Sequence, residues 1–501
     1  MIFSEFIENY KNRLESVFRT KDNIDELSLE RGLPKDLLNK VMDCKPLSTF
    51  IPDEYGGRGC KTHEALAMLE ATSYESLALS LMMGINGALF LQPLANYGNE
   101  EIKDEIFRRF LEENSMGGLM ITEPDYGSDA LRMETSYYKD EKNSNYRVKG
   151  TKHWAGLTGQ ADYWLITARK EKNGSGLGRD IGFFVHDSRN GGIEVEEYYN
   201  NLGLYMLPYG LNKIDITVPE EYKLNPRSTG IKMMLDVLHR SRLQFPGMGM
   251  GFLKRLLDEA HEHCKSRLVG GKNLFEYDQV KRRISRLQMA FTVCSAMCTY
   301  TSTKVPLKKD ASTMDVQANT IKTVTTDLMQ EASQSLLQLM GAKGYRLDHI
   351  AGRSVIDSRP FQIFEGSNDI LYQQITESVL KKMRRLKLSN MFEFLNKYEL
   401  TSNVADRFNG LFNFSVDSKM VQHKMVDMGR ILSRVISMEY TLRLQECGFN
   451  RELIDNSLKT LQAKVEQLMT SFQNDDSAEV IENYEENSSW VRFVSPELQY
   501  D

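Results

Sequence analysis

The sequence predicts a mostly helical protein with one β domain in its middle. Helical periodicity extends to about residue 117, short β-rich runs fill the next stretch, and long amphipathic segments return after residue 227. With 501 residues, the chain has room for several domains. We therefore expect an N-terminal α-helical domain (1–117), a middle β-barrel (118–227), a C-terminal four-helix bundle (228–389) and a helical extension with an acidic tail (390–501).

Apolar residues at three- and four-residue spacing predict the helices of the first domain. The clearest are EALAMLEATSYESLALSLMM and the charged segment NEEIKDEIFRRFLEE, preceded by the Gly-rich turn FIPDEYGGRG. The stretch 76–99 carries no charge and is long enough to span a bilayer. Because Asn86, Gly87 and Pro93 interrupt it, two buried helices joined near Asn86 fit better, and we expect no membrane span.

The later elements follow from the same patterns. Short runs separated by polar and Gly-rich segments predict the β domain: YRVKGTKHW, DYWLITAR, IGFFVHD, GIEVEEYY and NKIDITVP. Long amphipathic segments predict an antiparallel bundle: IKMMLDVLHRSR, GFLKRLLDEAHEHCKSRLV, YDQVKRRISRLQMAFTVCSAMCTY and VQANTIKTVTTDLMQEASQSLLQLM. Two more helices, MVDMGRILSRVISMEYTLRLQ and LIDNSLKTLQAKVEQLMTSFQ, precede the acidic stretch NDDSAEVIENYEEN.

Composition and charge exclude several protein classes. Hydrophobic residues make up 41% and charged residues 26% of the chain, which excludes wholesale disorder and a multi-span membrane protein. A net charge of −6 gives no general attraction to nucleic acid. The HEHC run at 261–264 places its side chains on different helix faces, so we expect no metal site. The charged N-terminal sequence is unlike a signal peptide, and we expect a cytoplasmic protein with reduced cysteines.

Three local patterns carry residues with chemical potential. ITEPDYGSDA, at 121–130, is either an ordinary turn or a loop that offers hydroxyls and N–H groups to a polar ligand. GTKHWAGLTGQAD places Trp154 in a loop after a strand, as a core anchor or a flat wall for an aromatic cofactor. In RPFQIFEGSNDI, Glu365 lies between Phe364 and Gly366. It is either a first-turn residue that favours the helix dipole or a general base with a raised pKa.

In this order, and within an α–β–α chain, these patterns resemble the acyl-CoA dehydrogenase flavoprotein family over about 48–386. ITEPDYGSDA is close to the family's TEP-x-x-GSD signature, and RVKGTKHWAG resembles the strand and loop around its flavin-facing Trp. QIFEGSNDI is similar to its I-[YF]-E-G-T motif, and LQLMGAKGY to its Q-x-x-G-G-x-G-[YF] segment. FIPDEYGGRG looks like its N-terminal loop. Arg242 and Arg267, 25 residues apart, fit its first bundle helix without a gap.

The resemblance implies α,β-dehydrogenation of an acyl thioester, either acyl-CoA or an acyl carrier protein thioester, as in fatty acid metabolism. Glu365 would remove the Cα proton while hydride leaves Cβ for N5 of FAD. Some family members place the base on an earlier helix, where this chain has Ser241. In the family, a backbone N–H of the base and a flavin hydroxyl stabilise the enolate oxygen. The resemblance also implies an electron-transferring flavoprotein as acceptor and a homodimer or homotetramer, because FAD contacts come partly from a neighbouring subunit.

The resemblance assigns roles to individual residues as well. Arg242 matches an Arg near the base, Thr122 a Thr that hydrogen-bonds the flavin ring, and Trp154 a Trp that flanks it. Ser128 matches a Ser near the thioester carrier. The diphosphate and adenosine of FAD would be held by Arg267, Gln338, Gly341 and Ser367.

Several departures from the family pattern leave alternatives open. Gly156 stands where a Thr beside flavin N5 is usual, so only its backbone can contact the flavin. An aromatic-Gly pair is replaced by Gly270–Gly271, and Gly156 and Gly270 together suggest an open environment. Other departures are at His239, Met340 and Ala342. The alternatives are a flavoprotein oxidase or monooxygenase of the same fold, and a non-catalytic scaffold built around the C-terminal extension.

Overall fold

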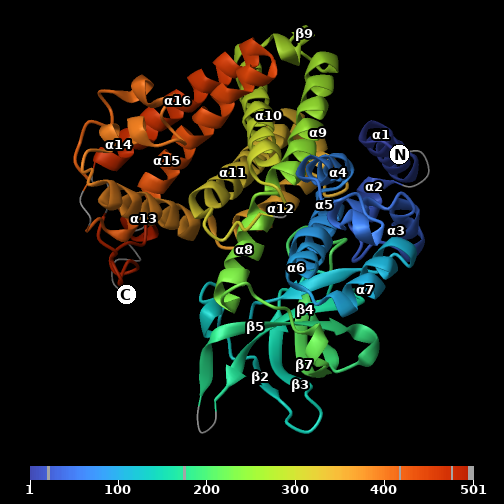
Figure 1. Ribbon diagram of the computed structural model, residues 1–501. Helices are drawn as coiled ribbons and strands as arrows, with labels where there is room; N and C mark the ends of the chain where they lie inside the picture. The colour runs from blue at the N-terminus through green and yellow to red at the C-terminus, as the bar shows by residue number, and fades with distance from the viewer. Residues whose placement is uncertain (20–22, 173–175, 308, 417–418, 475–477, 495–501) are drawn as a thin grey trace.

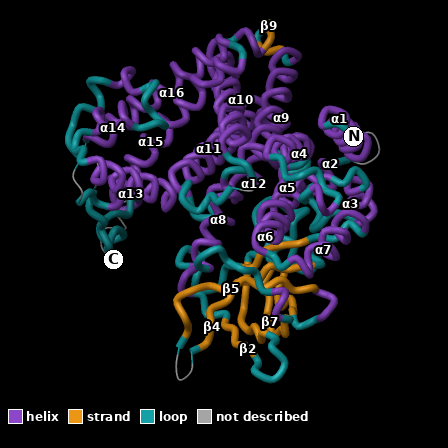
Figure 2. Tube along the Cα trace, viewed as in Figure 1, coloured by secondary structure: helices purple, strands orange, loops and turns teal. Residues whose placement is uncertain are grey.

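The protein is mostly helical, and the middle of its sequence forms a curled β-sheet, as the sequence predicts (Figure 1). The computed structural model describes residues 1–19, 23–172, 176–307, 309–416, 419–474 and 478–494. Parts of the expected acidic tail, 475–477 and 495–501, lie outside the described residues. The strands of the large sheet gather at one end of the molecule, and a short hairpin at 268–273 lies at the other end, among the helices (Figure 2).

The N-terminal domain contains the predicted helices, but the uncharged stretch is one helix rather than two. A π-helical segment, Ile85–Leu91, joins the flanking helices into one span, Leu77–Tyr97. The Gln92 N–H bonds to the carbonyl of Gly87, so the helix continues into Pro93 instead of ending before it. By length and composition this helix could cross a membrane, yet 94% of its apolar window is buried inside the molecule. The helices of the domain are α1 (Phe3–Phe18), α2 (Ile24–Leu27), α3 (Lys35–Met42), α4 (Thr62–Glu75), α5 (Leu77–Gly84), α6 (Gln92–Tyr97) and α7 (Glu100–Glu112).

The middle domain is a curled sheet of seven strands within the described ranges. The order is β1-β4-β2-β3-β7-β6, and β5 pairs with the other side of β4. The strands are β1 (Gly117–Met120), β2 (Ser136–Lys139), β3 (Tyr146–His153), β4 (Tyr163–Glu171), β5 (Leu177–Asp187), β6 (Ile193–Tyr198) and β7 (Gly210–Val218). The loops after β1 and β3 carry Thr122 and Trp154, so the sheet places both beside each other, with the Trp154 N–H bonded to Gly210.

The C-terminal helices run from α8 to α13. They are α8 (Gly230–Arg242), α9 (Phe245–Ser266), α10 (Asp278–Lys304), α11 (Asp315–Met340), α12 (Ile350–Ser358) and α13 (Asn368–Leu386). A short turn separates α8 from α9. Arg242 ends α8 and Arg267 follows α9. A hairpin of β8 (Leu268–Val269) and β9 (Lys272–Asn273) turns through Gly270 and Gly271 at φ 56° and 83°. A two-residue turn with both φ values positive favours glycine, which explains this pair.

The extension packs against the bundle as a further helical layer. Its helices are α14 (Met391–Lys397), α15 (Gln422–Arg443), α16 (Arg451–Gln473) and α17 (Val491–Val494). α15 packs on α13, and α16 packs on α10 and α15, on the side away from the N-terminal domain (Figure 1). Gly429 permits the close approach, since a Cβ there would lie 2.0 Å from the carbonyl oxygen of Tyr372.

Candidate active site

Glu365 lies in a tight segment, 363–367, between the 3₁₀ turn Arg359–Gln362 and helix α13. Its backbone is left-handed, with φ of 53°, and Gly366 follows at 90°. A non-glycine residue in this region is uncommon and needs surrounding contacts to hold it. Arg242 Nε donates to the carbonyl of Glu365 at 3.0 Å, and Lys322 Nζ donates to that of Gly366 at 2.9 Å. Two cationic side chains therefore fix the backbone that aims Glu365.

The carboxylate of Glu365 is buried, and its two oxygens have different surroundings. Ser241 Oγ donates to Oε1 at 2.8 Å, whereas Oε2 has no hydrogen-bond partner among the described residues. Burial raises the pKa of Glu365, and Arg242, the Ser241 hydrogen bond and Lys322 oppose the rise. One oxygen is thus held by Ser241, and the other can accept a proton.

Aromatic rings make the surroundings of Glu365 apolar. Phe364, its neighbour in the chain, packs 4.9 Å from Phe361 and 6.1 Å from Phe245 between ring centroids. Phe245 and Phe361 are fully buried. Such surroundings penalise a charged carboxylate, which is why burial dominates its titration.

Two buried basic side chains, Arg242 and Lys322, lie next to Glu365 and its segment. Arg242 Nη1 donates to Asn319 Oδ1 at 2.8 Å, and burial lowers the pKa of Arg242 to about 10. Lys322 also donates to Asn368 Oδ1 at 2.8 Å. Burial, together with the nearby Arg242, lowers the pKa of Lys322 to about 7 although Glu365 opposes the shift. At neutral pH, Arg242 therefore stays charged while Lys322 is partly deprotonated.

His239 occupies the position where an Asp is frequent in the resembled family, and it is not a second anion at the site. Its Nδ1 lies 3.0 Å from the carbonyl oxygen of Ala311, so that nitrogen carries the proton. Burial and the neighbouring Arg242 lower the pKa of His239 to about 4. The side chain is therefore neutral in the physiological range, and Arg242 keeps Glu365 as its carboxylate neighbour.

Trp154 offers a partly exposed ring just after the end of strand β3. The residue is 49% exposed, and its backbone is held at φ 54° by the N–H bond to Gly210. The ring packs 4.6 Å from Tyr199 and 6.0 Å from Tyr209 between centroids. The carbonyl of Thr122 accepts the N–H of His153, which joins the two loops. A rigid, exposed indole with a hydroxyl beside it suits a planar polar ligand.

A buried ion pair contacts the residues on either side of Thr122. Lys152 Nζ lies 2.8 Å from Glu123 Oε1 and 2.9 Å from the carbonyl oxygen of Ile121. Lys152 is fully buried, and burial lowers its pKa to about 8 although Glu123 opposes the shift. The pair contacts the chain on both sides of Thr122 and so fixes where that residue lies.

Gly156 faces protein atoms rather than open space. A Cβ at this position would lie 2.7 Å from Ile85 Cδ1 and 3.3 Å from Leu207 Cδ2. The expectation of an open environment at Gly156 was wrong on the side that a side chain would occupy. Ile85 fills the volume that the Thr of the resembled family would need.

The remaining predicted residues lie elsewhere. Ser367 is the N-cap of α13 and the last residue of the segment 363–367 that carries Glu365; its side chain makes no capping hydrogen bond. Ser128 is exposed in the loop after β1, and within the described ranges it makes no side-chain hydrogen bond. Arg267, Gln338 and Gly341 are exposed at the far ends of α9 and α11.

These last three form a second, basic region that one chain does not join to Glu365. His263 on α9 hydrogen-bonds the backbone of Leu339, and its pKa is lowered by burial and by the nearby Lys343 and Arg267. The part of α11 between Asn319 and Gln338 covers about 28 Å at 1.5 Å per residue. The two regions therefore lie at opposite ends of the bundle.

Sequence reasoning missed Asn319, which accepts a hydrogen bond from Arg242, and Lys322, which donates to the carbonyl of Gly366. Both lie in the ANTIKTVTTD part of α11, three residues apart and thus on one helix face. The signal was present, because an Asn and a Lys on the same face of a core helix need buried partners. The buried Glu123–Lys152 pair was missed for another reason, since its members lie on different loops and strands.

Three family models match consecutive parts of the chain. The models described as acyl-CoA dehydrogenase N-terminal, middle and C-terminal domains match residues 13–114, 118–215 and 228–380.

Similar proteins include enzymes of this type. A short-chain specific acyl-CoA dehydrogenase from Megasphaera elsdenii is 22% identical over 341 residues, which are 67% of this chain and 87% of that protein. The structure of an acyl-CoA dehydrogenase complexed with FAD from Bacillus anthracis has a TM-score of 0.77 at 17% identity, covering 94% of this chain and 87% of that chain. A prolyl acyl carrier protein oxidase has a TM-score of 0.66 at 18% identity, covering 75% and 99%.

Proposed function

The chain belongs to the acyl-CoA dehydrogenase family, and we propose that it removes hydrogens from Cα and Cβ of an acyl thioester with Glu365 as the base. Members of this family are flavin oxidoreductases that act on CH–CH bonds with FAD. The observation that carries the proposal is the Glu365 carboxylate, which is buried, held at one oxygen by Ser241 and unpartnered at the other among the described residues.

The residues present fit FAD. Trp154 is exposed beside Thr122, and Arg267 and Lys343 are exposed cations near one another at the far end of the bundle. An indole ring suits the flavin ring, and cations suit the diphosphate. When bound, FAD supplies the acceptor for the hydride that leaves Cβ.

The chain's own residues account for proton removal. The α-proton of a thioester is far too weakly acidic for an ordinary aqueous carboxylate, so a base with a raised pKa in apolar surroundings is required. Ser241 keeps Oε1 in place while Oε2 takes the proton. Within the described residues, the N–H of Glu365 donates to no carbonyl, so it can donate to the oxygen on which negative charge develops.

The test is Glu365→Gln, which keeps the shape of the side chain and removes the base. We expect the variant to bind FAD as the wild type does, with no bleaching of the flavin by acyl thioester. Glu331→Gln is the matched control, because Glu331 lies on the surface of α11 and pairs with Lys464. Bleaching by the Glu365 variant at the wild-type rate would refute the assignment.

We propose acyl-CoA as the substrate and an acyl carrier protein thioester as the second candidate. The match to the Megasphaera elsdenii enzyme supports the first, and the fold shared with the acyl carrier protein oxidase is compatible with the second. Bleaching measured with the same acyl group on each carrier separates them. An electron-transferring flavoprotein as acceptor, and a cytoplasmic location, stay predictions.

We propose a homodimer as the smallest unit that binds FAD fully, with a homotetramer as the alternative. The support is the distance between the two regions, since Arg267, Gln338 and Gly341 lie far from Glu365 in one chain. Light scattering gives the number of subunits. FAD release should accompany dissociation into monomers on dilution, and a monomer that retains FAD would contradict the proposal.

The oxidase or monooxygenase alternative loses its two supports. Gly156 faces Ile85 rather than a cavity, and Gly270 with Gly271 meets the needs of a hairpin turn. The scaffold alternative does not explain the two cations that hold a left-handed Glu365. Dehydrogenation therefore accounts for more of the geometry than either alternative.

A further inference from the structure

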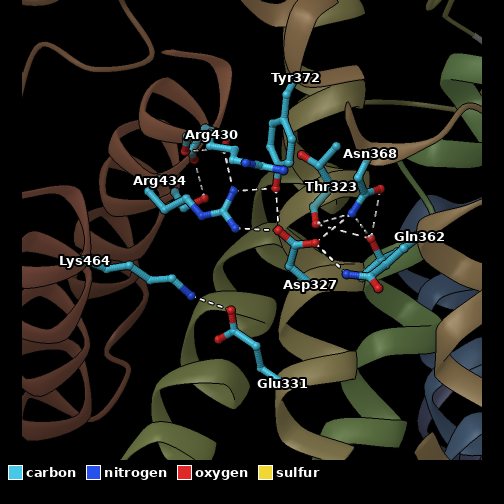
Figure 3. Close-up of polar contacts among 12 residues, drawn as sticks. Thr323, Asp327, Glu331, Gln362, Asn368, Tyr372, Arg430, Arg434 and Lys464 are labelled. Carbon is cyan, nitrogen blue, oxygen red and sulfur yellow. Dashed lines mark hydrogen bonds and ion pairs between the residues drawn. The ribbon is translucent and has the colours of Figure 1, made fainter. Parts of the chain in front are cut away.

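One carboxylate holds both ends of the segment that carries Glu365. Gln362, just before the segment, donates through Nε2 to Asp327 Oδ1 at 2.8 Å. Asn368, just after it, donates through Nδ2 to the same oxygen at 2.8 Å. Figure 3 shows Gln362 and Asn368 converging on Asp327. Asp327 on α11 is thus a clamp across the two ends of 363–367.

The other oxygen of this clamp is bound from the C-terminal extension. Arg434 on α15 reaches Asp327 Oδ2 at 2.5 Å, and Tyr372 donates to the same oxygen at 2.6 Å (Figure 3). The side chains of Asp327 and Arg434 are 17% and 7% exposed. With two donors on each oxygen, the carboxylate is saturated. Burial would raise the pKa of Asp327, but Arg434 and the hydrogen bonds lower it overall, so the group stays ionised.

The polar contacts continue from the clamp to the base. Asn368 Oδ1 accepts from Lys322, and Lys322 also donates to the carbonyl of Gly366, the residue after Glu365. An unbroken series therefore runs from Arg434 through Asp327, Asn368 and Lys322 to the base loop. Because this loop holds two consecutive residues in left-handed conformations, it depends on such contacts.

We propose that Arg434 is a positioning residue for Glu365, so that the C-terminal extension completes the active site of the bundle it covers. The proposal rests on the proposed function. Without the guanidinium, Asp327 is a buried carboxylate that has lost its closest cation, and it protonates or turns towards water. Either change weakens its hold on Gln362 and Asn368, and the aim of Glu365 is lost.

The test compares Arg434→Met with Lys464→Met in the full-length FAD-loaded protein. Lys464 is the matched control, because it joins the extension to the same helix through Glu331 but touches no residue of the clamp (Figure 3). We expect Arg434→Met to speed hydrogen–deuterium exchange across 361–368 and to lower kcat for the thioester about 10- to 100-fold. As the pH is lowered, the variant should also lose activity at a higher pH than the wild type does, since Asp327 then protonates more readily. Lys464→Met should stay within about twofold of the wild type.

A second variant covers the case in which Arg434→Met does not fold. The double variant Asp327→Asn/Arg434→Met removes both charges together and should recover stability. Its kcat should stay below that of the wild type, because the amide has a donor in place of the oxygen that accepts from Tyr372, and no group on α15 then orients it. Unchanged exchange across 361–368, or faster exchange with unchanged kcat and pH profile, would overturn the proposal. If no acyl thioester bleaches the flavin of the wild type, the proposed function fails. The exchange measurement still decides whether Arg434 holds the segment 363–367.

Discussion

Ser241 Oγ donates a hydrogen bond of 2.8 Å to Glu365 Oε1 across 124 positions of sequence. The contact joins the last turn of α8 to the base loop, at the position where some family members have the base itself. It leaves Oε2 as the oxygen without a described partner. In the proposed reaction, Ser241 therefore leaves Oε2 as the oxygen that takes the proton.

Ser241→Ala should move the acidic limb of the pH–rate profile upward. The Ser241 hydrogen bond favours the ionised form of Glu365, so its loss raises the pKa of Glu365 further. A base is active only when ionised, and activity should therefore disappear at a higher pH than in the wild type. Ser241→Thr keeps the hydroxyl and serves as the control. Identical limbs in the alanine and threonine variants would contradict this role.

Lys322→Met should change how stability depends on pH. The folded pKa of Lys322, about 7, lies below the ordinary value of a lysine. Between these two values the unfolded chain binds more protons, so this group makes the folded state more stable as pH rises above 7. Between pH 7 and 9 the wild type should gain roughly 2 kcal/mol relative to Lys322→Met.

Thermal unfolding of both proteins at pH 6, 7, 8 and 9 measures this difference. Below pH 7 the stabilities of the wild type and of Lys322→Met should change with pH in parallel, because Lys322 is then protonated in both the folded and the unfolded wild-type chain. Lys281→Met is the control, since Lys281 is exposed on α10. Parallel curves up to pH 9 would show that Lys322 keeps its proton.

The architecture could be predicted because it depends on local periodicity. Helices and strands occupy different parts of this sequence, and the turn residues that end each element lie next to it in the sequence. The error at 76–99 is instructive, because Gly87 and Pro93 are helix breakers on average. Here Gly87 leaves room for the Phe50 ring, 2.2 Å from its would-be Cβ, and a π-helical turn absorbs the irregularity. Tertiary packing overrode local propensity.

The site could be predicted only in part, for a similar reason. Glu365 and Trp154 stand in recognisable local patterns, and their candidate roles follow from a resemblance. Arg434 and Asp327 meet across 107 positions, and no local pattern shows that pairing. Likewise, the overlap between a side chain at position 156 and Ile85 can be predicted only when it is known that Ile85 lies against Gly156. Contacts that depend on the packing of distant helices are not encoded in spacing.

Lys152→Met should destabilise the sheet and weaken FAD binding. The substitution leaves the Glu123 carboxylate buried without its cation, at a cost of about 3–5 kcal/mol. It also frees the chain around Thr122. In Glu123→Gln/Lys152→Met the isolated charge is gone, so most of that loss should be recovered.

Thermal unfolding and an FAD titration of the three proteins provide the measurement. Lys139→Met is the control, since Lys139 on β2 of the same sheet pairs with Glu220 at an exposed position and this pair should contribute less than about 1 kcal/mol. Equal melting temperatures for Lys152→Met and Lys139→Met would show that the buried pair has no special weight.

Gly156→Thr, which introduces the residue usual in the family, should lower stability unless Ile85 is shortened as well. The Cβ would lie 2.7 Å from Ile85 Cδ1, closer than carbon atoms approach one another. The contact is with the end of a side chain, so the core can shift, at a cost of about 1–3 kcal/mol. Ile85→Val removes the Cδ1 atom that causes the overlap. The double variant Gly156→Thr/Ile85→Val should therefore melt closer to the wild type than Gly156→Thr does, even though Ile85→Val alone costs about 1 kcal/mol. If the two substitutions are simply additive in thermal unfolding, Ile85 is not what keeps a larger side chain out of this position.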